Sequence, residues 1–228
     1  MEIAVNISWW DTLGSKYVIG GGEPSSYVAC GNGYEFLSQA LRGVSSAQIL
    51  DHGVWEGRHL PILKALAGPQ GQVYGVDHPK SWYAVESALR QYPDVSFHPV
   101  GDFAPFPFPD EHFDAVLSWR TLHNLTARGQ LMFCLGELAR ILKVGSPLLV
   151  SVLAEKGSST LPQLKIGKNS AGNPRQSWYF SIMAVYATLC CGRGQLQVQK
   201  AEQVLEGSVI DGVQVQTPYW AVQLVRLK

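Results

Sequence analysis

Strand-like and helix-like segments alternate regularly between residues 33 and 153, and this alternation constrains the fold more than any other feature of the sequence. Short apolar runs that predict strands lie at 47–51, 72–77, 95–100, 113–119 and 147–153. Segments with helical periodicity lie between them, at 33–42, 58–67, 81–92 and 131–142. Strands that alternate with helices of this length form a parallel sheet with right-handed crossovers. The sequence therefore predicts a doubly wound α/β fold.

The last third of the chain has a different pattern. Residues 155–176 are rich in Gly, Ser, Asn, Pro and Lys, which predicts a long loop or lid. Residues 177–189 look helical, and two strand-like stretches follow at 195–205 and 219–227. Only a short, turn-rich segment separates these two stretches, so an antiparallel pair is expected to close the sheet. With the five parallel strands, this pair gives a mostly parallel, seven-stranded sheet.

Composition excludes several classes of function. Eighteen Lys and Arg residues balance eighteen Asp and Glu residues, so no global field favours nucleic acid or an acidic membrane. The four cysteines show no zinc-ligand spacing, and no metal site is expected. The N-terminus lacks the pattern of a signal peptide, and no apolar run reaches the length of a membrane span. We expect a cytoplasmic protein; the sequence gives no oligomeric state.

The segment after the first predicted strand is the strongest candidate for a ligand site. In open parallel sheets, ligands bind at the carboxyl ends of the strands, beside the first strand. Asp51 ends that strand, and Gly53 and Gly57 follow at positions where the backbone can turn sharply and approach a ligand. Arg58 adds a positive charge at the start of the next helix, although it also suits a solvated first turn. Asp51 could alternatively cap the turn and helix that follow.

This segment resembles motif I of class I S-adenosylmethionine (SAM) methyltransferases, an acid followed by spaced glycines ahead of a helix. Asp77 ends the second strand, where the family's acid binds the ribose hydroxyls, and Asp102 follows the third strand, where the family reads adenine. Segments 106–114 and 138–145 resemble further family motifs, so the resemblance covers about residues 33–153. It implies SAM as cofactor and a single domain, with an N-terminal segment or lid (1–32), a cofactor-binding core (33–153), and a lid loop, helix and closing strands (154–228). The cofactor-binding residues it implies are Asp51, Gly53, Trp55, Gly57, Asp77, Asp102, Phe103 and Ser118.

The end of the fourth strand carries the candidate catalytic residues. Residues 117–124 are similar to a methyltransferase subgroup with an Arg-x-x-His-Asn sequence, here Arg120, His123 and Asn124. The resemblance implies that these side chains face the methyl-transfer site. His123 is the candidate base, because its intrinsic pKa suits proton removal near neutral pH, although a lone histidine is more often structural. The other five histidines have no common spacing and are expected at the surface or in the core: His52, His59, His78, His98 and His112.

Trp55 is the main departure from the family pattern, because it occupies the position of the middle glycine of motif I. An indole there would either fill part of the SAM pocket or swing outward as a wall of the cleft. The first outcome predicts an inactive binding or scaffolding protein, and the second predicts a methyltransferase. If Trp119 also faces the cleft, the two indole rings would favour a small, aromatic or apolar acceptor. A nicotinamide-binding enzyme is a weaker alternative, because the GxGxxG spacing is absent.

Overall fold

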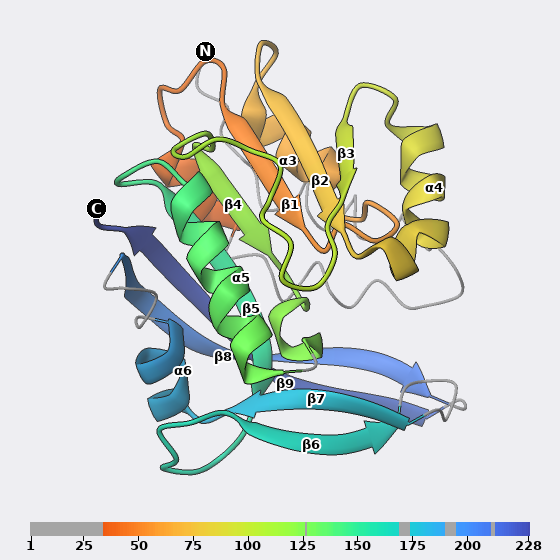
Figure 1. The fold of residues 1–228 in the computed structure, drawn as a ribbon, viewed down its shortest axis with the longest axis vertical. Coiled ribbons are helices and arrows are strands. Elements are labelled where there is room, and N and C mark those ends of the chain that lie inside the picture. The colour runs from red at the N-terminus through yellow and green to blue at the C-terminus, as the bar shows by residue number, and fades with distance from the viewer. Residues whose placement is uncertain (1–33, 126, 169–173, 190–194, 211–212) are drawn as a thin grey trace.

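The computed structural model describes residues 34–125, 127–168, 174–189, 195–210 and 213–228. Its described strands form one nine-stranded sheet in the order β3-β2-β1-β4-β5-β7-β6, with β9 paired to β5 and β8 paired to β9 (Figure 1). The pairs β1–β2, β1–β4, β2–β3 and β4–β5 are parallel. The mixed, mostly parallel α/β sheet predicted from the sequence is therefore confirmed, with nine strands in place of seven.

The central strands lie within a few residues of their predicted bounds. They are β1 (Gln48–His52), β2 (Gln72–Asp77), β3 (Ser96–Pro99), β4 (Ala115–Ser118) and β5 (Pro147–Ala154). The helices are residues 34–40, α3 (Leu60–Ala67), α4 (Trp82–Gln91), α5 (Arg128–Ile141) and α6 (Ile182–Leu189). Short 3-10 turns lie at η1 (Pro79–Ser81) and η2 (Leu122–Asn124).

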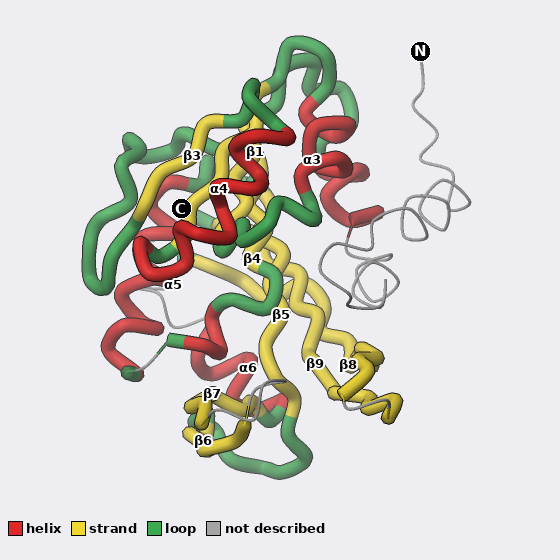
Figure 2. Tube along the Cα trace, turned by 90° about the vertical axis from the view of Figure 1, so that its right-hand side faces the viewer, coloured by secondary structure: helices red, strands yellow, loops and turns green. Residues whose placement is uncertain are grey.

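Alternate residues of each central strand supply two separate cores, one on each face of the sheet. In β1, Ile49 packs with the helix at 34–40, α3 and α4, whereas Leu50 packs with α5 and α6. In β4, Leu117 belongs to the first core and Val116 to the second. Figure 2 shows α3 and α5 on opposite sides of the strands. Because both faces are covered, adjacent residues of β1 and β4 are buried together and do not alternate with exposed ones.

The helices follow the predicted periodicity with one correction. In α5 the residues spaced for one face, including Leu131, Leu135 and Leu138, are fully buried. The helical spacing of 81–92 predicts that Leu89 is buried, but it is 36% exposed, and Ala84, Val85 and Ala88 are buried instead.

The prediction of a loop over 155–176 and a helix from 177 was wrong. The structure has an antiparallel pair there, β6 (Gln163–Lys168) and β7 (Pro174–Phe180), and α6 begins only at Ile182. The last residues of β7 continue the sheet parallel to the end of β5, where Leu153 and Ala154 pair with Tyr179 and Phe180. A hairpin at a sheet edge needs few apolar residues, which explains its loop-like composition.

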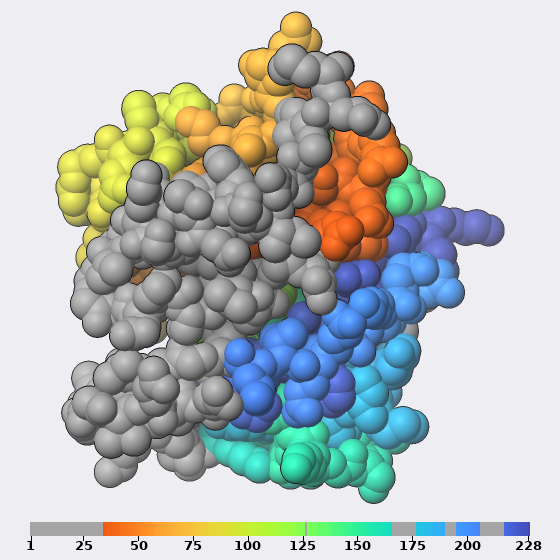
Figure 3. Space-filling model, turned by 180° about the vertical axis from the view of Figure 1, so that it is seen from behind, coloured from red at the N-terminus to blue at the C-terminus, as the bar shows by residue number. Residues whose placement is uncertain are grey.

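The closing antiparallel pair was predicted and is confirmed, although it is longer than expected. It comprises β8 (Leu196–Ile210) and β9 (Val213–Arg226), and β9 pairs with β5 from Pro147 to Leu153. Both this hairpin and β6–β7 extend past the carboxyl end of β5 (Figures 1 and 2). The back view in Figure 3 shows β8 at the surface. None of the described helices is long and apolar enough to cross a bilayer.

Some sequence predictions lie outside the described residues. They include the N-terminal segment or lid at 1–32 and the cysteines Cys30, Cys190 and Cys191. Cys134, in α5, is a buried free thiol. Among the described residues, no three His, Cys, Asp or Glu side chains are grouped so that they could hold a metal ion.

Candidate functional site

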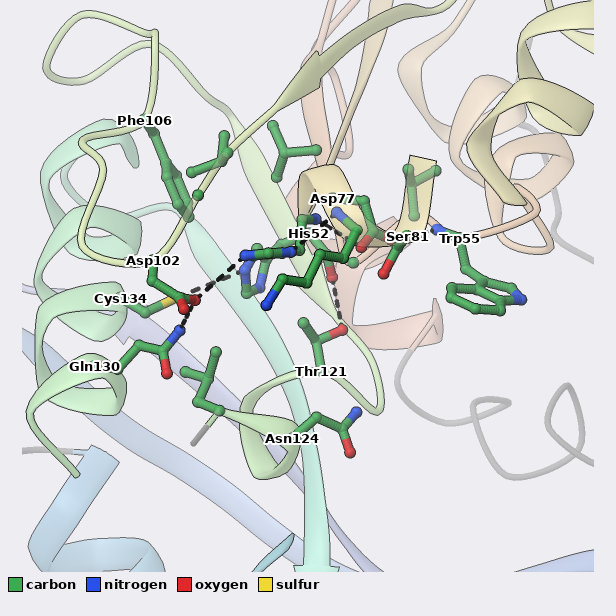
Figure 4. A pocket seen from close by; sticks show the side chains of 18 of the residues that line it. His52, Trp55, Asp77, Ser81, Asp102, Phe106, Thr121, Asn124, Gln130 and Cys134 are labelled. Carbon is green, nitrogen blue, oxygen red and sulfur yellow. Dashed lines mark hydrogen bonds and ion pairs between the residues drawn. The ribbon is translucent and has the colours of Figure 1, made fainter. Parts of the chain in front are cut away.

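A cavity of about 540 Å³ lies at the carboxyl ends of β1, β2 and β4 (Figure 4). Its volume is in the usual range for small-molecule sites. The walls come from the turn after β1, the ends of β2 and β4, the loop at 100–106 and one face of α5. This is the edge of the sheet at which the sequence predicted a ligand. Of the residues predicted for the site, those that line the cavity are Gly53, Trp55, Asp77, Asp102, Phe103, Arg120 and Asn124.

Gly53 lies where the chain turns out of β1 into the cavity wall. Its φ is 80°, and its backbone N–H donates to the carbonyl of Val76 at 2.8 Å. A Cβ on Gly53 would lie 2.0 Å from Oγ1 of Thr121, whose hydroxyl donates to the carbonyl of His52. No side chain fits there without displacing the end of β4. Gly57 also has a positive φ, 78°, but it is buried against Leu60 and does not line the cavity.

Trp55 has a left-handed backbone conformation of the kind that glycine adopts most easily. Its φ is 48°, in the left-handed region that disfavours a bulky side chain, and its N–H donates to Asp77 Oδ2 at 2.8 Å. The indole packs edge-on against Tyr83, with ring centroids 5.4 Å apart. Figure 4 shows the indole directed away from His52 and Asp102. The side chain therefore forms an outer wall and does not fill the hollow between these residues.

Three of the four non-glycine residues with positive φ in the described chain line this cavity. They are Trp55, Phe103 (φ 55°) and Arg120 (φ 60°), and the fourth is Glu111. Such backbone conformations cost on the order of 1–3 kcal/mol each and tend to cluster at functional sites. The clustering supports this cavity as the functional site independently of any motif.

Two carboxylates line the opposite sides of the cavity. Asp77 accepts the N–H groups of Trp55 and His78, at 2.8 and 2.7 Å, while burial raises its pKa. Asp102 is half exposed, and it accepts a hydrogen bond from Gln130 and lies 3.5 Å from Nε2 of His78. Phe103, next in sequence, is 56% exposed and packs against Phe133. Asp77 is thus held in one orientation by backbone amides, whereas Asp102 is held by side chains that can move.

Asp51 lies behind the cavity wall rather than in it. Its carboxyl group is 1% exposed, and neither oxygen has a hydrogen-bond partner among the described residues. Burial raises the pKa of this carboxyl to about 8; the charge of Asp77 raises it further and that of Arg58 opposes the rise. A buried acid without a partner is costly when it is charged, and the raised pKa keeps this carboxyl protonated near neutral pH.

Only two of the three predicted catalytic residues, which follow β4, line the cavity. The side chains of Arg120 and Asn124 line it, and Asn124 donates to the carbonyl of Arg120 at 2.7 Å. His123 does not line it: the imidazole is 2% exposed and lies against the ring of Tyr219, 5.7 Å between centroids. Ser118 is fully buried and bonds to His52 instead.

His52 is a cavity residue that the sequence analysis assigned to the surface or core. Its Nδ1 lies 2.8 Å from Oγ of Ser118, and its Nε2 lies 3.6 Å from Sγ of Cys134. Burial lowers the pKa of this histidine to about 4, so the ring is neutral near neutral pH. Its position between Asp51 and Gly53 in the sequence could have identified it as a cavity residue, because a residue inside a ligand-binding turn is adjacent to the ligand.

Comparison with known proteins gives a family assignment for part of the chain. Residues 49–145 match a family model described as a methyltransferase domain. An uncharacterized methyltransferase of Anoxybacillus flavithermus is 27% identical over 128 residues, which are 56% of this chain and 57% of that protein. The chain therefore matches little more than half the length of this curated relative.

Solved structures share the fold over most of the chain. A SAM-dependent methyltransferase of Methanosarcina mazei has a TM-score of 0.60 at 14% identity, covering 80% of this chain and 93% of its own. The 1,6-didemethyltoxoflavin-N1-methyltransferase of Burkholderia thailandensis, solved with its acceptor and S-adenosylhomocysteine, has a TM-score of 0.59 at 15% identity, covering 100% and 93%. The [4+2]-cyclase SpnF also has a TM-score of 0.60, at 13% identity and 86% and 80% coverage. At these identities the similarity establishes the fold alone.

Proposed function

Since this chain carries a class I SAM-dependent methyltransferase domain, we propose that the protein transfers the methyl group of SAM to a small-molecule acceptor. The observation that carries the proposal is the convergence of Gly53, Asp77 and Asp102 on one cavity, with the indole of Trp55 as an outer wall that is directed away from His52 and Asp102. The sequence predicts all three as cofactor-binding residues. A small-molecule acceptor is the class described for the Burkholderia enzyme.

The residues of the cavity fit the cofactor. A Cβ on Gly53 would collide with Thr121, so the turn offers only backbone to the cavity at this position. Each oxygen of Asp77 accepts one backbone amide and the carboxylate also accepts a hydrogen bond from Ser81, which leaves acceptor capacity for a ribose hydroxyl. Asp102, half exposed, accepts the adenine amino group. Asp51 lies behind the wall of the cavity and is protonated near neutral pH, so it gives no fixed charge to the site.

When bound, SAM would supply an electrophilic sulfonium methyl group: the acceptor's nucleophile would bond to the methyl carbon in line while the carbon–sulfur bond breaks and neutral S-adenosylhomocysteine leaves. Because that leaving group is already good, the protein contributes chiefly orientation. Arg120 and Asn124 hold the acceptor, and Trp119 gives an apolar wall suited to an aromatic or apolar body. The role of His123 as a base stays a prediction; its burial behind the wall favours support of Tyr219 over contact with the acceptor.

Isothermal titration with SAM and S-adenosylhomocysteine tests cofactor binding. We expect micromolar dissociation constants for the wild type and a loss of at least about tenfold for Asp77→Asn, since hydrogen bonds to a charged group contribute about 1.5–3 kcal/mol. Gly53→Ala is expected to abolish binding, because its Cβ would collide with Thr121. The matched control is Gly136→Ala in α5, where a Cβ meets nothing within 4 Å. No heat of binding for the wild type at high protein concentration would contradict the proposal.

The alternative of a scaffold that has lost SAM depended on Trp55 filling the pocket. Its indole is directed away from the residues that surround the hollow, so the described geometry gives this alternative no support. Transfer of label from methyl-labelled SAM to a small-molecule extract separates the two functions. Binding of SAM without transfer to any extract fraction would favour the binding protein.

A further inference from the structure

We propose that His52 contacts the cofactor and helps to select its base: the Nε2–H group of His52 donates a hydrogen bond to a ring nitrogen of adenine, beside the amino group assigned to Asp102. This inference rests on the proposed function, because it concerns the cofactor end of the same cavity. Three observations carry it: the contacts that hold the imidazole, the tautomer that these contacts require, and the position of the ring relative to Asp102.

The imidazole of His52 is held in one orientation by groups from three parts of the fold. Its Nδ1 lies 2.8 Å from Oγ of Ser118 in β4, and its Nε2 lies 3.6 Å from Sγ of Cys134 in α5. The ring also packs against Phe106, in the loop that carries Asp102, with ring centroids 5.5 Å apart. His52 is 8% exposed and lines the cavity. The cavity wall therefore contains an imidazole of fixed orientation.

Ser118 decides which ring nitrogen carries the proton. Burial lowers the pKa of His52 to about 4, so the ring has a single N–H near neutral pH. The side chain of Ser118 is fully buried, and in the described part of the chain its hydroxyl makes this one hydrogen bond. A buried hydroxyl proton without an acceptor is costly, so the hydroxyl donates to Nδ1. The proton of the neutral ring is therefore on Nε2.

The Nε2–H group faces a weak acceptor. Its partner is the thiol of Cys134, which burial keeps protonated by raising its pKa to about 12. Thiol sulfur accepts hydrogen bonds weakly, and the two atoms are 3.6 Å apart. A ligand atom with a stronger lone pair, such as a ring nitrogen of a base, would take this donor in preference to the thiol.

His52 and Asp102 lie against the same face of α5. Asp102 accepts a hydrogen bond from Gln130, and His52 contacts Cys134, four residues further along the helix. Side chains four residues apart lie on one face of a helix. Figure 4 shows His52 and Asp102 directed toward the same part of the cavity, which both residues line. A donor and an acceptor placed in this way complement adenine, which presents a ring-nitrogen acceptor next to its amino donor.

A chemical form of the double-mutant cycle tests the contact. The ligands are S-adenosylhomocysteine and its 1-deaza, 3-deaza and 7-deaza analogues, each of which has C–H in place of one ring nitrogen of adenine. Calorimetric titration of the wild type should show one analogue binding about 3- to 10-fold more weakly than S-adenosylhomocysteine, the effect of one hydrogen bond. The acceptor molecule is absent from every titration, so the measurement concerns the cofactor alone.

The variant for the cycle is His52→Phe combined with Ser118→Ala. The second substitution is needed because His52→Phe alone would leave the buried hydroxyl of Ser118 without an acceptor. We expect this double variant to bind the discriminated analogue and S-adenosylhomocysteine within about twofold of each other. His98→Phe, in β3, makes the same change at a histidine that does not line the cavity, and it should keep the wild-type ratio.

The outcomes separate this inference from the proposed function. The inference is overturned if the wild type binds S-adenosylhomocysteine and discriminates against none of the analogues. It is also overturned if every discrimination found in the wild type persists in the double variant. No binding of S-adenosylhomocysteine to the wild type would instead overturn the proposed function, on which the inference rests.

The single variant Ser118→Ala tests the positioning role of the serine while His52 stays in place. Without the hydroxyl, the proton can move to Nδ1, so the ratio of the two affinities should fall toward one. Nitrogen-15 NMR of histidine-labelled protein reads the tautomer directly, and the signals of His52 are those that change in Ser118→Ala. We expect the wild-type signals to show a proton on Nε2. A proton on Nδ1 would contradict the inference even if the double variant did not fold.

Discussion

Asp51 is a carboxyl group that is almost completely removed from water, at 1% exposed. Burial raises its pKa from 3.8 to about 8, so the folded protein holds a proton that the unfolded chain releases above pH 4. A raised pKa in the folded state contributes stability that is full below the unfolded pKa and is lost as pH rises through the folded pKa. The apo protein should therefore lose stability between about pH 4 and pH 8 because of this group.

Asp51→Asn removes that dependence. We expect the free energy of unfolding of the variant to exceed that of the wild type at pH 8, and the difference to shrink by at most about 1.4 kcal/mol per pH unit on going to pH 5. Urea unfolding of both proteins between pH 5 and 9 measures it. His52 also contributes to the pH dependence, because its lowered pKa destabilises the fold under acid conditions. Both proteins contain His52, so this contribution cancels when they are compared. Parallel profiles for the two proteins would contradict the assignment.

Trp55 gives a second prediction for a single residue. Because its indole lies outside the hollow, Trp55→Gly should change the affinity for S-adenosylhomocysteine by less than about threefold, or 0.7 kcal/mol. Relief of the left-handed strain should stabilise the protein by about 1 kcal/mol. The added freedom of a glycine in the unfolded chain should destabilise it by about the same amount, so the net stability should change little. Calorimetry and thermal unfolding measure both effects. A tenfold gain in affinity would mean that the indole obstructs the cofactor.

At the scale of elements, one side chain of β9 holds the end of α5. Arg226 is 8% exposed, and its Nη1 donates to the carbonyls of Arg140, at 3.1 Å, and Leu142. These are carbonyls at the C-terminus of the helix, which have no partner inside it. A positive charge there is also favourable for the helix dipole.

Arg226→Ala should therefore destabilise the protein by about 2–3 kcal/mol, since it leaves buried carbonyls without charged donors. Lys200→Ala, which removes an exposed ion pair with Glu202 in β8, should change stability by less than about 1 kcal/mol. Denaturant unfolding of the two variants compares them directly. Equal, small effects would show that the contacts to α5 add nothing to stability.

For the whole molecule, both cores depend on the same strands. Ile49 and Leu50 are adjacent in β1, fully buried, and belong to opposite cores. Ile49→Ala and Leu50→Ala should each destabilise the protein by about 2–5 kcal/mol. Because neither core exists without the sheet, unfolding of the described domain should stay a single transition in both variants. Two resolved transitions, followed by tryptophan fluorescence and by circular dichroism, would contradict this.

The sequence by itself determined the order of the elements and the place of the site. The central strands are short, mainly apolar segments, and their alternation with helices predicts a parallel sheet. Once the sheet is parallel, Gly53, Asp77 and Asp102 must meet at one edge, because each follows the carboxyl end of its strand. These statements follow from local patterns and from chain connectivity.

Only the tertiary structure decided where individual side chains point and which polar segments pair. His123 and His52 are both strand-end histidines, yet His52 lines the cavity and His123 packs behind it against Tyr219. The indole of Trp55 is directed outward and packs against Tyr83 of α4. The β6–β7 pair forms where β5 extends beyond β4 and offers a free edge. Each outcome depends on contacts between residues distant in sequence, which local periodicity does not encode.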